Sequence, residues 1–143
     1  MTALAHIVDG PVTSEVVTQA LATPAWRAGR EGAHTGAIVR FDGVVRRMEV
    51  DASGEGRALV ALDYQTYDPM ADRELTALAA RILETHALLR IAAIHSRGRV
   101  EVGATSFVLI VEAAHRAEAL VAMGAFIDAL KVDAPIWKRP IWA

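Results

Sequence analysis

The chain has 143 residues, of which 53% are hydrophobic, and this composition excludes an intrinsically disordered protein. The formal net charge of −2 gives no global attraction to nucleic acid or to anionic membranes. The absence of cysteine excludes disulfides, thiolate metal sites and cysteine nucleophiles. We expect a single domain over residues 1–143 with a sizeable hydrophobic core.

The N-terminal sequence "MTALAHIVDG" has neither the basic start nor the long apolar centre of a signal peptide. No apolar run approaches the roughly 20 residues of a membrane-spanning helix. These features predict a cytoplasmic protein that binds neither membrane nor nucleic acid.

The first predicted element is a short helix over residues 13–23, which Thr13 or Ser14 can cap and which ends before Pro24. A polar, glycine-bearing loop is expected over residues 26–36. The alternation in "GAIVRFDGVVR" then predicts a strand in which Gly43 marks a bulge or a close approach.

A turn region over residues 48–57 separates this strand from a second strand over residues 58–67. The longest predicted helix follows over residues 68–89, with Asp68 as its cap and Pro69 at its first position. Its apolar residues repeat at helical spacing, which predicts a buried face formed by Ala71, Leu75, Leu78, Ala79 and Ile82.

Two strands are predicted next, over residues 91–98 and 100–114, and the second of them is expected to break near Gly103. A second long helix covers residues 115–131, and the tail after it is expected to be irregular. The apolar face of this helix is predicted to consist of Ala119, Leu120, Met123, Phe126, Ile127 and Leu130. Strand groups bounded by helices, with alternating patterns, predict an α+β fold with a mostly antiparallel sheet.

The two lysines, Lys131 and Lys138, lie near the C-terminal end, whereas the other thirteen basic residues are all arginine. Lysine can release a proton in a reaction and arginine does not, so both positions are candidates for proton transfer. Two solvated lysines beyond a helix would give the same pattern. The rigid, apolar flanks of Lys138 in "PIWKRP" favour a segment that lies in a groove over a solvated tail.

Other cationic residues suggest anion binding. Arg46 and Arg47 end a predicted strand beside a glycine, where guanidinium groups can clamp a phosphate or carboxylate, although two surface arginines would look the same. His115 and Arg116 open a helix, whose free N–H groups attract anions, but a polar entry to the helix is an equal alternative. The remaining histidines are scattered and predict no metal site, and no glycine-rich phosphate loop or hydrolase motif is present.

Four stretches, "GAIVRFDGVVR", "LDYQTYDPMADREL", "VEVGATSFVLIVEAAHRAEALVAMGAFIDALK" and "PIWKR", together resemble the large, catalytic subunit of molybdopterin synthase. The resemblance runs from about residue 36 to residue 139. It implies an α/β hammerhead fold with an added antiparallel β subdomain.

The resemblance also implies a function in molybdenum cofactor biosynthesis. Enzymes of this family convert cyclic pyranopterin monophosphate into molybdopterin with two sulfurs from a small, ubiquitin-like subunit that ends in a Gly-Gly thiocarboxylate. Two large subunits form a homodimer, and two small subunits complete a heterotetramer. No cofactor or metal is implied.

The resemblance assigns catalytic roles to Lys131 and Lys138, and it places His115 and Arg116 at the substrate phosphate of the neighbouring large subunit. The residues that it implies in substrate contact are Val44, Val45, Arg46, His115, Arg116, Lys131, Lys138 and Arg139.

The chain departs from the family pattern at four points. Arg97 is displaced by one position in "HSRG", Gln65 replaces a glutamate, Pro140 stands where an acidic residue is usual, and the chain ends at Ala143. Two alternatives to the enzyme therefore stay open. One is a non-catalytic protein of the same fold that binds a pterin or a ubiquitin-like tail, and the other is a domain that binds another phosphorylated ligand through Arg46 and His115.

Overall fold

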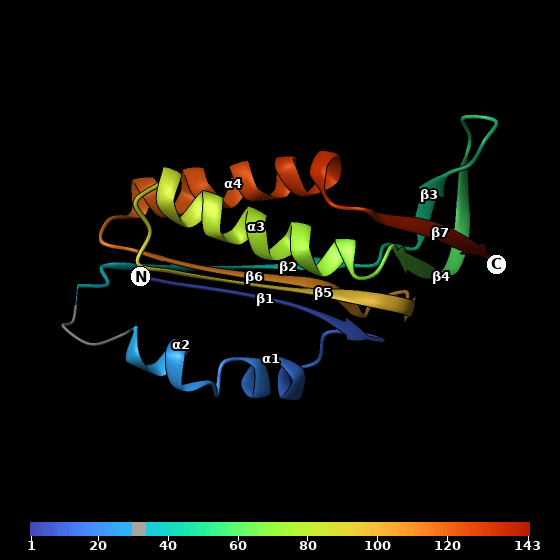
Figure 1. Cartoon of the computed structure of the whole chain (residues 1–143). Helices are drawn as coiled ribbons and strands as arrows, with labels where there is room; N and C mark the ends of the chain where they lie inside the picture. The colour runs from blue at the N-terminus through green and yellow to red at the C-terminus, as the bar shows by residue number, and fades with distance from the viewer. Residues whose placement is uncertain (30–33) are drawn as a thin grey trace.

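The computed structural model describes residues 1–29 and 34–143, and in this part of the chain helices cover both faces of a β-sheet (Figure 1). The elements in chain order are β1 (Thr2–Asp9), α1 (Ser14–Ala20), α2 (Pro24–Ala28), β2 (Ala37–Val44), β3 (Met48–Val50), β4 (Gly56–Thr66), α3 (Met70–Thr85), β5 (Arg90–Glu101), β6 (Thr105–Ala113), α4 (Arg116–Asp133) and β7 (Ile136–Trp142).

The main sheet is formed by β2, β6, β5 and β1, in that order. β2, β6 and β5 pair antiparallel, whereas β1 runs parallel to β5. The predicted α+β class with mostly antiparallel pairing is therefore confirmed, and β1 is the exception.

Two hydrophobic cores lie on opposite faces of this sheet. α3 and α4 cover one face, where Leu75 and Phe126 pack with Leu109 of β6. α1 and α2 cover the other face, where Trp26 packs with Ile94 of β5. Apolar residues on both faces explain why β5 and β6 are almost continuously buried.

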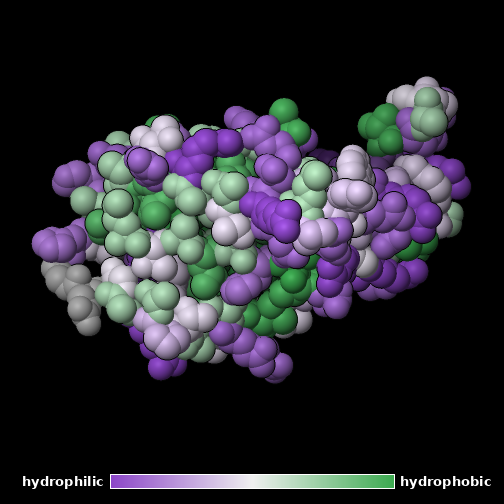
Figure 2. All heavy atoms as spheres, in the orientation of Figure 1, coloured by the Kyte–Doolittle hydropathy of each residue, from purple (hydrophilic) through white to green (hydrophobic). Residues whose placement is uncertain are grey.

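A second set of strands extends the sheet at one end and forms an antiparallel subdomain. The C-terminal part of β5 pairs with β4, β4 also pairs with β7 and β3, and Leu59, Leu62 and Val100 form a third core there. The β3–β4 hairpin stands away from the main sheet (Figure 1). Met48 and Val50 are exposed, and Figure 2 shows hydrophobic atoms on this projection.

Several predictions of local structure are corrected. α2 overlaps the start of the predicted loop, because the Thr23 side chain accepts a hydrogen bond from the Trp26 N–H and Pro24 suits the first turn. Residues 30–33 of that loop lie outside the described part of the chain. β1 and β3 were not predicted, and β7 replaces the predicted irregular tail. β7 pairs with β4, and Pro140 is accommodated in this strand opposite Leu62.

The two long helices are confirmed, with corrections in detail. Pro69, not Asp68, is the N-cap of α3, and the Asp68 carboxylate accepts hydrogen bonds from Thr66 and Arg97 instead. In α4, Leu120 was predicted to be buried but is 57% exposed, whereas Ala122, which was not predicted, is buried. The strands predicted at residues 91–98 and 100–114 are divided differently, because β5 continues to Glu101 before the chain turns at Gly103.

Two glycines should respond in opposite directions to alanine. Gly103 has a φ of +86°, which strains a residue with a Cβ, so Gly103→Ala should destabilise the protein by about 1–2 kcal/mol. Gly124 lies inside α4 with open space around it, so Gly124→Ala should stabilise the protein by up to about 1 kcal/mol. Urea unfolding of both variants tests this pair of signs, and a loss of stability in Gly124→Ala would contradict it.

Candidate active site

Two of the predicted cationic residues meet at one carboxylate. The Lys138 Nζ donates a hydrogen bond to the Glu49 Oε1 at 3.0 Å, and an Arg46 guanidinium nitrogen lies 3.7 Å from the same oxygen. Arg46 follows β2, Glu49 lies in β3 and Lys138 lies in β7. We call these three residues the cationic cluster.

The backbone before Arg46 is fixed by an irregularity between β2 and β6. The register shifts between Gly43 and Val44, as predicted, and Ser106 of β6 is the additional residue. The next residue, Val45, is buried, and its N–H donates to the Ala104 carbonyl at 3.0 Å. Val45 therefore holds the chain immediately before Arg46, and its side chain belongs to the core of the subdomain. Val44, by contrast, is half exposed.

Lys138 and Arg139 do not point the same way. Successive residues of a strand face opposite sides of the sheet, and Lys138 lies opposite Tyr64 of β4. Arg139 donates a hydrogen bond to the Asp63 carboxylate at 3.1 Å. Arg139 is therefore outside the cationic cluster.

Lys131 lies in the last turn of α4 and lines a groove of about 620 Å³. Met70 and Glu74 of α3 line the same groove, together with Trp137 of β7. Within residues 1–29 and 34–143, no acidic side chain forms an ion pair with Lys131. Lys131 therefore lies at the groove near the Glu74 carboxylate without being tied to it by an ion pair.

His115 and Arg116 lie at the opposite end of α4 from Lys131. Both are exposed, and His115 is the N-cap residue but makes no capping hydrogen bond with its side chain. At a rise of about 1.5 Å per residue, α4 separates Arg116 from Lys131 by roughly 22 Å. One chain therefore does not bring all the predicted residues to one small ligand.

Two hydroxyl groups form a chain of hydrogen bonds from β4 through β6 to β2. The Tyr64 hydroxyl donates to the Ser106 hydroxyl at 2.9 Å, and Ser106 donates to the Gly43 carbonyl at 3.3 Å. His95 packs edge-on against the Tyr64 ring, and its Nδ1 lies 2.7 Å from the Ser96 carbonyl oxygen. Burial lowers the pKa of His95 below its ordinary value, so this imidazole is neutral near pH 7.

The buried histidine predicts a pH dependence of stability. The unfolded chain binds a proton at His95 near pH 6.5, whereas the folded chain resists it, so the free energy of unfolding falls as the pH drops below about 6.5. The slope can reach about 1.4 kcal/mol per pH unit. His95→Phe should flatten this slope between about pH 7 and pH 5 in urea unfolding measurements. Equal slopes in both proteins would contradict the prediction.

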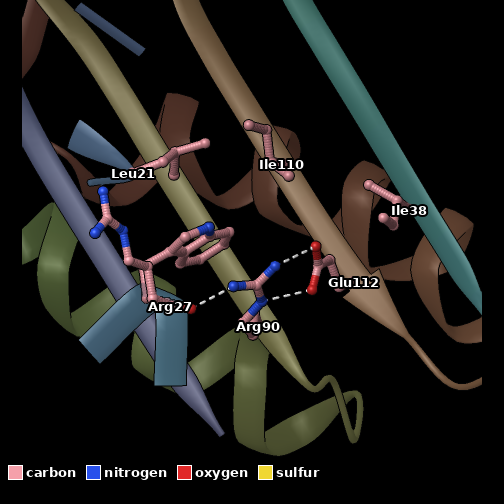
Figure 3. Close-up of a pocket in the computed structure, with 7 residues that line it drawn as sticks. Leu21, Arg27, Ile38, Arg90, Ile110 and Glu112 are labelled. Carbon is pink, nitrogen blue, oxygen red and sulfur yellow. Dashed lines mark hydrogen bonds and ion pairs between the residues drawn. The ribbon is translucent and has the colours of Figure 1, made fainter. Parts of the chain in front are cut away.

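A second hollow, of about 450 Å³, lies on the face covered by α1 and α2 (Figure 3). Arg90 of β5 donates two hydrogen bonds of 2.5 Å to the Glu112 carboxylate of β6, and a third to the Trp26 carbonyl. The Arg90 guanidinium also lies 4.0 Å from the centre of the Trp26 ring. These contacts satisfy a buried charged pair and indicate a structural role.

Among the described residues, no three histidine or acidic side chains gather as metal ligands would, and no helix is long and apolar enough to span a membrane.

Comparison with protein families decides the classification: the sequence model of the MoaE protein family matches residues 13–133. This chain belongs to the MoaE family.

Individual relatives of this chain are named as molybdopterin synthase catalytic subunits. The chain is 38% identical over 107 residues to the molybdopterin synthase catalytic subunit of Oryza sativa subsp. indica, a match that covers 75% of this chain and 53% of the rice protein. It is 39% identical over 108 residues to the catalytic subunit of a Nostoc species, covering 75% of this chain and 62% of that protein. The match thus spans only about half to three-fifths of these relatives.

Solved MoaE structures share the fold. Molybdopterin synthase from Staphylococcus aureus matches with a TM-score of 0.74 and 28% identity, over 96% of this chain and 90% of that one. The complex of subunits 1 and 2 of molybdopterin-converting factor from Helicobacter pylori matches with a TM-score of 0.69 and 21% identity, over 97% and 89%, which supports the fold alone.

Glu49 was missed in the sequence. Its one local signal is its position three residues after Arg46 in "RRMEV", a spacing that is common in exposed loops. From the family resemblance, an acidic residue is expected after Lys138 and Arg139, but this chain has Pro140 there. The carboxylate that contacts Lys138 comes from Glu49 of β3 instead.

Proposed function

We propose that this MoaE protein is the large, catalytic subunit of a molybdopterin synthase. Its substrate is cyclic pyranopterin monophosphate, and its sulfur donor is a small ubiquitin-like subunit with a C-terminal Gly-Gly thiocarboxylate. The observation that carries the proposal is the meeting of Arg46 and Lys138 at one carboxylate, because these two residues occupy positions that the resemblance assigns to the active site.

The residues divide the reaction between them. Lys138 and Lys131 serve the thiocarboxylate end, where an ammonium group stabilises negative charge and transfers protons. The thiocarboxylate sulfur forms a bond to a side-chain carbon of the pterin while a carbon–oxygen bond at that carbon breaks, and the departing oxygen keeps the bonding electron pair. Water then hydrolyses the acyl–sulfur bond, which leaves sulfur on the pterin and a carboxylate on the small subunit. Arg46 binds an anionic group of the substrate through its guanidinium.

The phosphate end requires a second chain. Because α4 holds His115 and Arg116 roughly 22 Å from Lys131, we propose that these residues bind the phosphate in the active site of the partner subunit of a homodimer. Val44, beside the cationic cluster, and Arg139 are proposed to contact the substrate at the rim. We propose that two large and two small chains form a heterotetramer in the cytoplasm. The H. pylori relative is itself a complex of two different subunits.

The test is reconstitution. The chain is mixed with the thiocarboxylated small subunit and the cyclic precursor, and formation of the dithiolene product is measured. Product supports a catalytic subunit. Binding of the precursor or small subunit without product would favour a non-catalytic binding protein of the same fold. Binding of neither would leave a domain for another phosphorylated ligand.

A further inference from the structure

The cationic cluster is unevenly exposed. The Glu49 side chain is 16% exposed, whereas the side chains of Lys138 and Arg46 are 52% and 76% exposed. The carboxylate therefore lies beneath the two cations, and the cations face solvent.

Both cations keep free hydrogen-bonding capacity in this arrangement. An ammonium group has three donors and a guanidinium has five. Lys138 uses one donor on Glu49, and the 3.7 Å separation of Arg46 from the same oxygen is an ion pair without a hydrogen bond. An anionic group can thus bind from the solvent side while Glu49 stays in place.

Glu49 also joins segments that are far apart in the sequence. It lies 89 residues before Lys138, and its hydrogen bond links β3 to β7, both of which pair with β4. A flexible lysine side chain loses much of its rotational freedom when its end is held in this way. The ion pair therefore selects one position of the Lys138 ammonium group.

We propose that Glu49 is a positioning residue for sulfur transfer, acting through Lys138 and Arg46. It holds the two cations at the reacting anion, and its own negative charge lowers the affinity of the site for that anion. This inference rests on the proposed function. The anion has the chemistry of a phosphate ester or of a C-terminal carboxylate, and the experiment distinguishes the two.

The test uses Glu49→Gln in the reconstituted enzyme. Loss of the carboxylate's charge should lower kcat about tenfold or more, because a neutral amide holds the ammonium group less firmly than a carboxylate does. It should also tighten anion binding about fivefold, because one negative charge is removed. Calorimetry with the cyclic precursor and with the unmodified small subunit, which ends in a carboxylate, shows which anion faces the cluster.

Glu101→Gln is the matched control. Glu101 is an exposed glutamate of β5 that accepts a 2.5 Å hydrogen bond from Arg99, so this variant has the same change in charge and also loses an ion pair. It should leave kcat and both affinities unchanged. An unchanged kcat in Glu49→Gln, or failure of both anions to bind more tightly, would overturn the inference.

A second measurement is independent of activity. The chain has two lysines, so selective ¹³C labelling at the ε-carbon gives two lysine signals. Relaxation measurements on the full chain should show one lysine side chain more restricted than the other, and Glu49→Gln should release it whereas Glu101→Gln should not. If the lysine is released but the wild-type protein forms no product, the proposed function fails and the positional role stands. If it is equally mobile in all three proteins, the inference fails.

Discussion

Lys138→Ala should lower the rate of product formation by about 10²–10⁴-fold in the reconstituted reaction. The expected loss is that of a group that stabilises charge and transfers protons in the transition state. Lys138 is half exposed at the edge of the subdomain, so truncation leaves no buried cavity and the fold should be retained. Single-turnover kinetics with thiocarboxylated small subunit measure the effect.

Lys138→Arg separates charge from proton transfer. Arginine keeps the positive charge and can still pair with Glu49, but it does not release its proton. We expect this variant to bind the precursor and to remain at least tenfold slower than the wild type. Full activity of Lys138→Arg would show that proton transfer by this residue is unnecessary. Arg99→Ala removes an exposed cation of β5 and serves as the control with normal activity.

Glu112→Gln should produce the largest loss of stability among the predicted variants. Arg90 and Glu112 are each 2% exposed, so removing the carboxylate's charge leaves a buried guanidinium without its counter-ion. Breaking such a pair from one side costs about 3–5 kcal/mol. Urea unfolding should show this as a lower transition midpoint.

Two further variants make this prediction specific. Asp133→Asn breaks the exposed ion pair with Arg81 and should cost less than about 1 kcal/mol. Replacing both buried partners, Arg90→Met with Glu112→Leu, should recover much of the loss because no unpaired charge remains. If Glu112→Gln is no more destabilising than Asp133→Asn, the buried pair contributes little.

Local sequence patterns were sufficient to predict the elements whose structure is set by residues close together in the chain. α3 is long and amphipathic, α4 is long enough to be recognised, and glycine at residue 103 marked the turn between β5 and β6. β1 and β7 were missed for a different reason. Each is stabilised by pairing with a strand distant in sequence, β5 and β4 respectively, and no local pattern records that partner.

Residues of the candidate site likewise fall into those that the sequence could predict and those that it could not. Arg46, Lys131 and Lys138 were recognisable by residue type and by family resemblance. Glu49 was not, because its importance depends on a hairpin that brings it to a strand 89 residues later. The separation of Arg116 from Lys131 could be calculated once the helix between them was predicted, since helix length follows directly from residue number.

The projecting hairpin has a consequence for how the molecule responds to other molecules. Glu49 belongs to this hairpin and Lys138 belongs to β7. Their ion pair therefore links the orientation of the hairpin thermodynamically to the arrangement of the cations. Such linkage is reciprocal. A molecule that shifts the hairpin, for example by covering Met48 and Val50, alters anion binding at the cationic cluster. Conversely, an anion that draws Lys138 away from Glu49 alters the affinity of the hairpin for that molecule by the same factor.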